Sequence, residues 1–568
     1  MGTTRALRDN DEFVRVGDRR QVVDASLLQH TERLNRKLHT VRDGVWCLVG
    51  NGLSNQTFIE GPLGLIAIDT GESVEEMQEA LDEIRKVTNT PIVAVMYTHF
   101  HYASGTTAIM SSNPVSEVWG HSKIETNLRR SATEIAPAYG RGLVEQFAIQ
   151  MPVDGPDGNV NVGLGLAYRM SRHAPFTPGH VPATREFSEP STISVAGLTV
   201  EVTPAPSDAD DSVTLWFPEL EVAVHNLMWP ALFNVFAIRG EEYRDPRVLL
   251  NGLDHLHSLG AAHLVATHGP PISDKVDIAR RLRNYRDSIQ FLWDQTVRWT
   301  NRGATTEELA HHIHLPEVFA QDWLTQQHYG VAEHHVRQIR TGLFGFFDGD
   351  TSKLLPVERV EHAELVIDAM GGLDSVRSRC DAAKELNPRW ALELATSLVD
   401  HPEATDADNE RLADVLRVVA RRTTSANLRN WCLTKALDLD GTIDMSRHRT
   451  HRLTRRQVGN WTIAASVAVL RVMIEPERLV DIDHHVEFDI DGERAGLHFR
   501  NHIACPTNGA TAESKVTMSR ATWTDLLCEK LTWADAVTAG DVKVSGDVNG
   551  VTQCLSALDH PSFAGSYE

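Results

Sequence analysis

Between residues 45 and 105, short apolar runs alternate with one amphipathic stretch. Residues 56–60 and 63–69 are two β-rich runs separated by Gly-Pro, a pattern that predicts a hairpin. The next stretch, SVEEMQEALDEIRKV, repeats apolar residues at helical spacing. TPIVAVMYTHFH is then continuously apolar up to its histidines, which is typical of a strand buried on both faces. This strand–helix–strand order predicts an α/β unit whose functional end is the loop after Tyr97.

The pattern changes again further along the chain. Residues 197–238 have the composition of further strands, and residues 250–268 predict a helix followed by a strand. From about residue 274 to residue 440 the chain is mostly helical, with a break at Gly371-Gly372. After residue 448, alternating polar and apolar positions predict strands and then an amphipathic segment.

A chain of 568 residues is long enough for about four domains. We divide it where the pattern changes. The expected parts are an N-terminal arm at 1–40, an α/β domain at 41–290, a helical domain at 291–440 and an α+β domain at 445–568.

Composition and charge narrow the class of protein. Hydrophobic residues make up 42% of the chain and charged residues 23%, as in globular rather than disordered proteins. The net charge of −22 argues against nucleic acid or anionic membranes as partners. The six cysteines form no C-x-x-C pair, and the start of the chain lacks the apolar core of a signal peptide. We expect a cytoplasmic protein without stable membrane insertion.

Two histidines separated by one residue, His99 and His101, directly follow the predicted buried strand. α/β proteins place their sites at such strand ends, and neutral imidazoles are common ligands for zinc and similar metals. This segment therefore predicts a metal site. The alternative is a pair of surface histidines in a loop.

Three later segments also end strand-like runs with polar side chains. They contribute Asp208 and Asp211 in an acidic cluster, then His225, then His268. Strands that repeatedly end in His or Asp indicate one metal site assembled from several strand ends. The alternatives are a solvated turn for the aspartates and a core or cleft position for His225.

These motifs resemble a known family. SNQTFIEGPLGLIAIDTGES, THFH and the later strand-end TH are similar to the metallo-β-lactamase fold, while WPALFNVFAIRGEEYRD and GLFGFFDGD resemble the alkyl sulfatases. The resemblance implies an αββα sandwich, a helical dimerisation domain that makes a homodimer, and a sterol-carrier-like C-terminal domain. It also implies metal-dependent cleavage of a sulfate ester of an amphipathic molecule.

The chain departs from the family pattern T-H-x-H-x-D-H, in which the last two residues hold a second metal. Ala103 and Ser104 stand at those positions, and His225 stands near the family's bridging carboxylate. The family's first-site carboxylate falls near Asp208 or Asp211, and Asp211 is also a candidate for catalysis. We therefore expect one metal per chain, zinc before iron or manganese.

The resemblance also implies a set of substrate-binding residues. Arg239 matches a family arginine suited to gripping sulfate, because a guanidinium fits a tetrahedral oxyanion. Asn234, Arg244 and Tyr329 are further candidates. For Arg244 the alternative is a surface pair with Asp245 or Glu242.

Two other functions remain open from the residues alone. Two histidines and one carboxylate also suit a mononuclear non-haem iron oxygenase. The chain could instead be a non-catalytic lipid-binding dimer on a degenerate hydrolase scaffold. Apolar positions of the last domain are expected either to line an apolar pocket or to fill a core: Val486, Phe488, Leu497, Phe499, Val516, Met518, Trp523, Leu526 and Leu527.

Overall fold

A computed structural model describes residues 3–112, 115, 117–130, 134–451, 453–459 and 461–563. The chain forms two compact units. The first contains Met1–Glu125 and Leu143–Ile443, and the second contains Thr126–Gly142 and Asp444–Glu568. None of the helices in the described ranges has the length and apolarity needed to cross a membrane.

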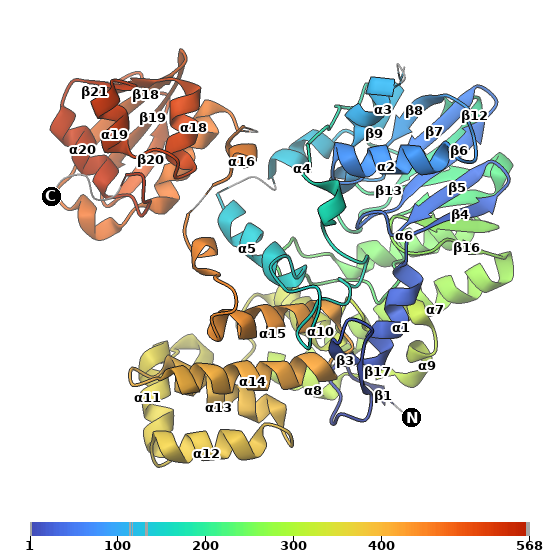
Figure 1. Cartoon of the computed structure of the whole chain (residues 1–568), viewed down its shortest axis with the longest axis horizontal. Helices are drawn as coiled ribbons and strands as arrows, with labels where there is room; N and C mark the ends of the chain where they lie inside the picture. The colour runs from blue at the N-terminus through green and yellow to red at the C-terminus, as the bar shows by residue number, and fades with distance from the viewer. Residues whose placement is uncertain are drawn as a thin grey trace. The chain divides into compact units, whose positions relative to one another are not determined.

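The first unit contains a seven-stranded sheet in the order β10-β9-β8-β7-β6-β5-β4. Strands β9 to β4 of this sheet are labelled in Figure 1. The expected hairpin is confirmed as β6 (Gln56–Gly61) and β7 (Gly64–Ile68), and the buried strand as β8 (Ile92–Met96), parallel to β7. The expected helix is α2 (Val74–Ile84). The other elements of this sheet region are β4 (Lys37–Arg42), β5 (Val45–Val49), α3 (Thr106–Ser112), β9 (Glu117–His121) and β10 (Arg185–Phe187). Most of α4 (Ile124–Arg130) and of α5 (Ala136–Gln146) belongs to the second unit.

A second, six-stranded sheet packs face to face with the first. Its strands, in spatial order, are β11 (Ser191–Val195), β12 (Leu198–Pro204), β13 (Val213–Phe217), β14 (Val222–His225), β15 (His263–Ala266) and β16 (Ile272–Ser273). Ile66 and Met96 of the first sheet share one buried cluster with Leu215 and Val224 of the second. Apolar strand faces are removed from water in this way, which is the main stabilising contribution of the sandwich.

Helices cover the outer faces of the two sheets. α2 packs beside β6 and buries Met77 and Leu81, while α6 (Pro246–Ser258) and α7 (Lys275–Thr300) share a buried cluster with the second sheet. This arrangement is the expected αββα sandwich. The predicted domain boundary at 290 falls inside α7, so the helical part of the chain begins without a linker at that point.

The first forty residues contain more structure than the expected arm. β1 (Thr3–Thr4) pairs with β17 (Leu315–Pro316), and β2 (Val14–Val16) pairs with β3 (Val22–Asp24). α1 (Ala25–Leu34) buries Leu27, His30 and Leu34. The expected boundary at 40 lies within β4.

The helical region continues through α8 (Thr306–His312), α9 (Glu317–Ala320), α10 (Ala332–Phe344), α11 (Arg359–Ala369), α12 (Leu373–Ala383), α13 (Pro388–Asp400), α14 (Asp406–Arg422) and α15 (Ala426–Leu439). The predicted break at Gly371-Gly372 separates α11 from α12, because both glycines adopt a φ of 91°. α12 to α15 share a buried core. By contrast, the segment from Phe344 to Leu365 exposes several large apolar side chains: Phe344, Phe346, Leu354, Leu355, Val357, Val360 and Leu365.

The second unit has a five-stranded sheet in the order β20-β19-β18-β21-β22. Its elements are α16 (Arg455–Gly459), α17 (Ile463–Ala468), β18 (His484–Ile490), β19 (Glu493–Arg500), β20 (Ile503–Thr507), β21 (Ser514–Met518), α18 (Arg520–Leu527), α19 (Trp533–Ala539), β22 (Val542–Ser545) and α20 (Val548–Ser556). The predicted amphipathic segment is two helices, α18 and α19. All nine apolar side chains named for this domain belong to one buried cluster, so they fill a core.

Candidate metal centre

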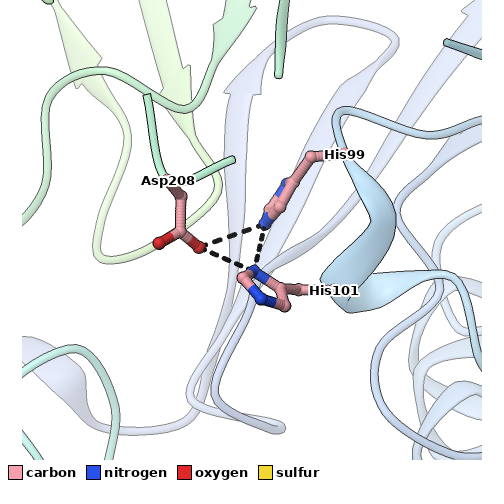
Figure 2. Close-up of side chains that lie close together, drawn as sticks. All are labelled: His99, His101 and Asp208. Carbon is pink, nitrogen blue, oxygen red and sulfur yellow. Dashed lines mark hydrogen bonds and ion pairs between the residues drawn. The ribbon is translucent and has the colours of Figure 1, made fainter. Parts of the chain in front are cut away.

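The predicted His-x-His motif lies in the loop after β8, beside the loop between β12 and β13 (Figure 2). His99 Nε2 lies 3.1 Å from His101 Nδ1, and Asp208 Oδ2 lies 3.3 Å and 2.8 Å from these two nitrogens. The three ligand atoms all fall within 4.8 Å of one another. Among the described residues this is the one group of His, Cys, Asp and Glu side chains close enough to hold a metal ion.

The protonation states of His99 and Asp208 suit a divalent cation. Burial lowers the pKa of His99, so its imidazole is neutral near pH 7. Burial alone would raise the pKa of Asp208, but the Arg244 guanidinium and His101 hold it well below its usual range. A neutral imidazole and an ionised carboxylate are the forms that bind metals.

A hydrogen-bond relay fixes the orientation of His99. Asp69 accepts from the Thr98 backbone N–H at 2.8 Å and from the Thr98 hydroxyl at 2.7 Å. The hydroxyl can therefore accept from Nδ1 of His99, 2.9 Å away, which leaves the lone pair on Nε2. The backbone of Asp69 has a φ of 56°, in the left-handed region. Aspartate adopts this conformation more readily than most residues, and such positions are often found at functional sites.

The structure separates the two candidate aspartates. Asp208 belongs to the three-residue group, whereas Asp211 Oδ2 accepts from the backbone N–H of Phe100 at 3.1 Å. Asp211 thus supports the loop that carries both histidines. We therefore propose Asp208, and not Asp211, as the metal-binding carboxylate.

Arg244 is not the surface residue of the alternative interpretation. It is buried, and its guanidinium lies 2.5 Å from Asp208 Oδ1. Asp245, which the alternative interpretation paired with Arg244, pairs with Arg247 instead. Arg244 and Asp208 are 36 positions apart, so no local pattern predicts their contact.

His225 and His268 are both buried, but their ring nitrogens are used differently. Nδ1 of His225 accepts from the backbone N–H groups of Leu227 at 3.2 Å and Met228 at 3.4 Å. Burial lowers its pKa to about 3, so the neutral ring must carry its proton on Nε2. Neither nitrogen then offers a lone pair to a metal, which argues against the expected ligand role of His225.

His268 has the opposite tautomer. Its Nδ1 donates to the Leu53 carbonyl at 2.9 Å, and Nε2 is buried without a hydrogen-bond partner among the described residues. Burial lowers the pKa of His268 to about 4, against the attraction of Asp208. A ring fixed through Nδ1, with a free lone pair on Nε2, is the usual state of a metal-binding histidine. His268 lies outside the three-residue group but fits a further ligand.

Tyr102 was not singled out from the sequence. Its ring makes edge contacts with the rings of His99, at 5.2 Å between centroids, and His268, at 5.4 Å. Burial and Asp208 raise the pKa of Tyr102 well above its ordinary value, so the phenol stays protonated. The next residues, Ala103 and Ser104, are buried and supply neither a carboxylate nor an imidazole.

Gln146, which was also missed, joins two of the candidate substrate residues, Arg239 and Tyr329. Its side-chain oxygen accepts from the Arg239 backbone N–H at 3.3 Å, and its nitrogen donates to the Tyr329 hydroxyl at 3.2 Å. The Arg239 side chain pairs with Glu241 at 2.7 Å. Nδ2 of Asn234 is buried without a hydrogen-bond partner among the described residues.

Known proteins share this organisation. Residues 305–442 match the family "Alkyl sulfatase dimerisation". A linear primary-alkylsulfatase of Pseudomonas sp. is 30% identical over 525 residues, covering 88% of this chain and 98% of the relative. An alkyl/aryl-sulfatase of Saccharomyces cerevisiae is 25% identical, covering 92% of this chain and 82% of the relative.

A solved structure extends the likeness to the fold. The stereoselective inverting sec-alkylsulfatase of Pseudomonas sp. superposes with a TM-score of 0.80 at 23% identity, covering 98% of this chain and 93% of that one. Similarity along nearly the full length of a relative cannot come from a single shared domain. The chain therefore belongs to the alkylsulfatase family.

Proposed function

We propose that this protein is a metal-dependent hydrolase that cleaves the sulfate ester of an alkyl or amphipathic alcohol. The observation that carries the proposal is the group of His99, His101 and Asp208, whose ligand atoms lie within 4.8 Å of one another. It occurs in a chain that is 30% identical to a linear primary-alkylsulfatase over 98% of that protein's length.

His99, His101 and Asp208 would hold one divalent ion per chain, with His268 as a further ligand. Zinc is the proposed metal, and iron or manganese are the alternatives, because imidazole and carboxylate ligands suit all three. A bound divalent ion supplies a hydroxide near neutral pH and polarises the ester. Thr98 and Asp69 keep the lone pair of His99 directed at the site.

The sulfate group would be bound by Arg239 and Asn234. The side chain of Gln146 accepts from the backbone N–H of Arg239 and so helps to fix the position of this residue. Asn234 offers a buried amide donor. Such donors stabilise the negative charge that builds up as the ester bond breaks. Glu241 holds the guanidinium when no substrate is bound, and the sulfate would compete with it for the same N–H groups.

We further propose a homodimer formed through the segment Phe344–Leu365. Phe346 is 72% exposed and Leu355 is 87% exposed, and apolar side chains gathered in this way are usually covered by another surface. The segment lies inside the part of the chain that matches the dimerisation family. The sterol-carrier-like character of the second unit stays a prediction.

The direct experiment is release of inorganic sulfate from a linear alkyl sulfate by the purified, zinc-loaded protein. His99→Ala and His101→Ala should lose both metal and turnover, whereas His311→Ala, at the exposed end of α8, should retain them. Arg239→Gln should keep the metal but lower kcat/KM by about a hundredfold or more, as for other lost oxyanion donors. Oxygen consumption without sulfate release would support the iron oxygenase instead, and bound lipid without turnover would support the binding protein.

A further inference from the structure

The two oxygens of the Asp208 carboxylate face different partners. Oδ2 faces the histidines, 2.8 Å from His101 Nδ1 and 3.3 Å from His99 Nε2. Oδ1 lies 2.5 Å from the terminal guanidinium nitrogen of Arg244. One oxygen therefore points toward the proposed metal, and the other is bound to a cation supplied by the protein.

Arg244 is held rigidly in this position. Its Nε donates to the Asp208 carbonyl at 3.2 Å, and a further guanidinium nitrogen donates to the Asn234 carbonyl at 2.7 Å. The guanidinium lies over the rings of Trp229, at 5.7 Å, and Phe233, at 5.9 Å. These contacts use the planar shape of a guanidinium and its donors on three separate nitrogens, which the single nitrogen of an ammonium group cannot reproduce.

From this geometry we propose that Arg244 is a positioning residue that occupies Oδ1 of Asp208 and so limits the carboxylate to a single metal ion. The inference rests on the proposed metal site. A carboxylate that bridges two ions with one oxygen on each needs both oxygens free, and here Oδ1 is bound to Arg244. The guanidinium charge also repels a second cation close to the same oxygen.

The same side chain links the two halves of the proposed site. Through its bonds to Asp208 and to the Asn234 carbonyl, Arg244 fixes the spacing between a metal ligand and the loop that carries a sulfate-binding candidate. Arg244 thus acts on the metal through Asp208 and on the sulfate through the Asn234 backbone.

Arg244→Lys tests this role, because it keeps the charge but removes the fork of donors. Metal-free protein would be titrated with Zn²⁺ against a chromophoric chelator. We expect the affinity of Arg244→Lys to fall by at least about tenfold, the size of other outer-shell losses at metal sites. The matched control is Arg247→Lys, whose exposed pair with Asp245 lies outside the site and should leave the affinity unchanged. Wild-type affinity in Arg244→Lys would overturn the proposal.

A second measurement needs no variant and so does not depend on its folding. Anomalous diffraction from wild-type crystals grown with Zn²⁺ should show one ion on Oδ2 of Asp208, with Arg244 still on Oδ1. Two ions bridged by Asp208, with Arg244 turned away, would overturn the proposal. Both readouts are metal binding and not turnover. A protein that binds one ion but cleaves no alkyl sulfate would contradict the proposed function and leave the role of Arg244 intact.

Discussion

The hydroxyl of Thr98 lies 2.9 Å from Nδ1 of His99, on the side of the ring away from the proposed metal. Because the hydroxyl donates to Asp69, it accepts from His99 and keeps the lone pair on Nε2. Thr98→Val removes the hydroxyl at nearly constant volume. We expect zinc affinity to fall about tenfold or more. Thr98→Ser keeps the hydroxyl and should bind zinc as the wild type does; equal affinity in the valine variant would contradict the relay.

The two strand-end histidines should respond differently to the same substitution. His268→Asn removes a free Nε2 lone pair and should weaken zinc binding by at least about tenfold. His225→Asn should leave the affinity unchanged, because the His225 ring already uses Nδ1 as an acceptor for two backbone N–H groups. Titration of the metal-free variants measures both constants. A large loss in His225→Asn would restore His225 to the ligand set.

His335 predicts a pH dependence of stability outside the metal ligands. It is fully buried in α10, and burial lowers its pKa from 6.5 to about 3. The unfolded chain therefore binds a proton below about pH 6.5 that the folded chain excludes, so the free energy of unfolding falls as pH falls toward about 3. When the pH falls from about 7.5 to about 5.5, His335 should lower the free energy of unfolding by about 1.4 kcal/mol.

Denaturant unfolding of metal-free protein at the two pH values, wild type against His335→Gln, measures that contribution. The variant should lose less stability on acidification, by about 1.4 kcal/mol. An identical pH dependence in both proteins would show that His335 does not stay neutral in the folded state.

The proposed dimer contact predicts a change of mass. Light scattering should give twice 63.1 kDa for the wild type. Leu355→Glu combined with Phe346→Glu places two charges on the exposed apolar segment and should shift the protein toward the monomer, because burying an unpaired charge is costly. Leu63→Glu, at a 75% exposed position of the β6–β7 turn, is the control and should stay dimeric. Wild-type protein of monomer mass would contradict the proposal.

The sandwich was predictable because its signals are local. The Gly-Pro turn, the periodicity of α2 and the apolar run of β8 each depend on a few neighbouring residues. The pairing of His99 and His101 was predictable for the same reason, since one strand end carries both. The structure of residues 3–34 was not, because its buried positions are few and its partners, such as β17, lie far along the chain.

The contacts that hold the site residues in position join residues that are far apart in the sequence. Arg244 reaches Asp208 across 36 positions, and Gln146 reaches Tyr329 across 183. Periodicity and spacing do not report such pairs. The tautomers of His225 and His268 depend on which backbone groups surround each ring, so two similar strand-end histidines could not be told apart in the sequence.

We propose that a single bound metal ion enables this chain to cleave alkyl sulfates. The most direct test is to add Zn²⁺ stepwise to metal-free protein while measuring sulfate release from a linear alkyl sulfate. Turnover should be absent without metal and should rise linearly until one ion is bound per chain, with no further increase. Turnover that survives metal removal, or that requires two ions per chain, would contradict the account.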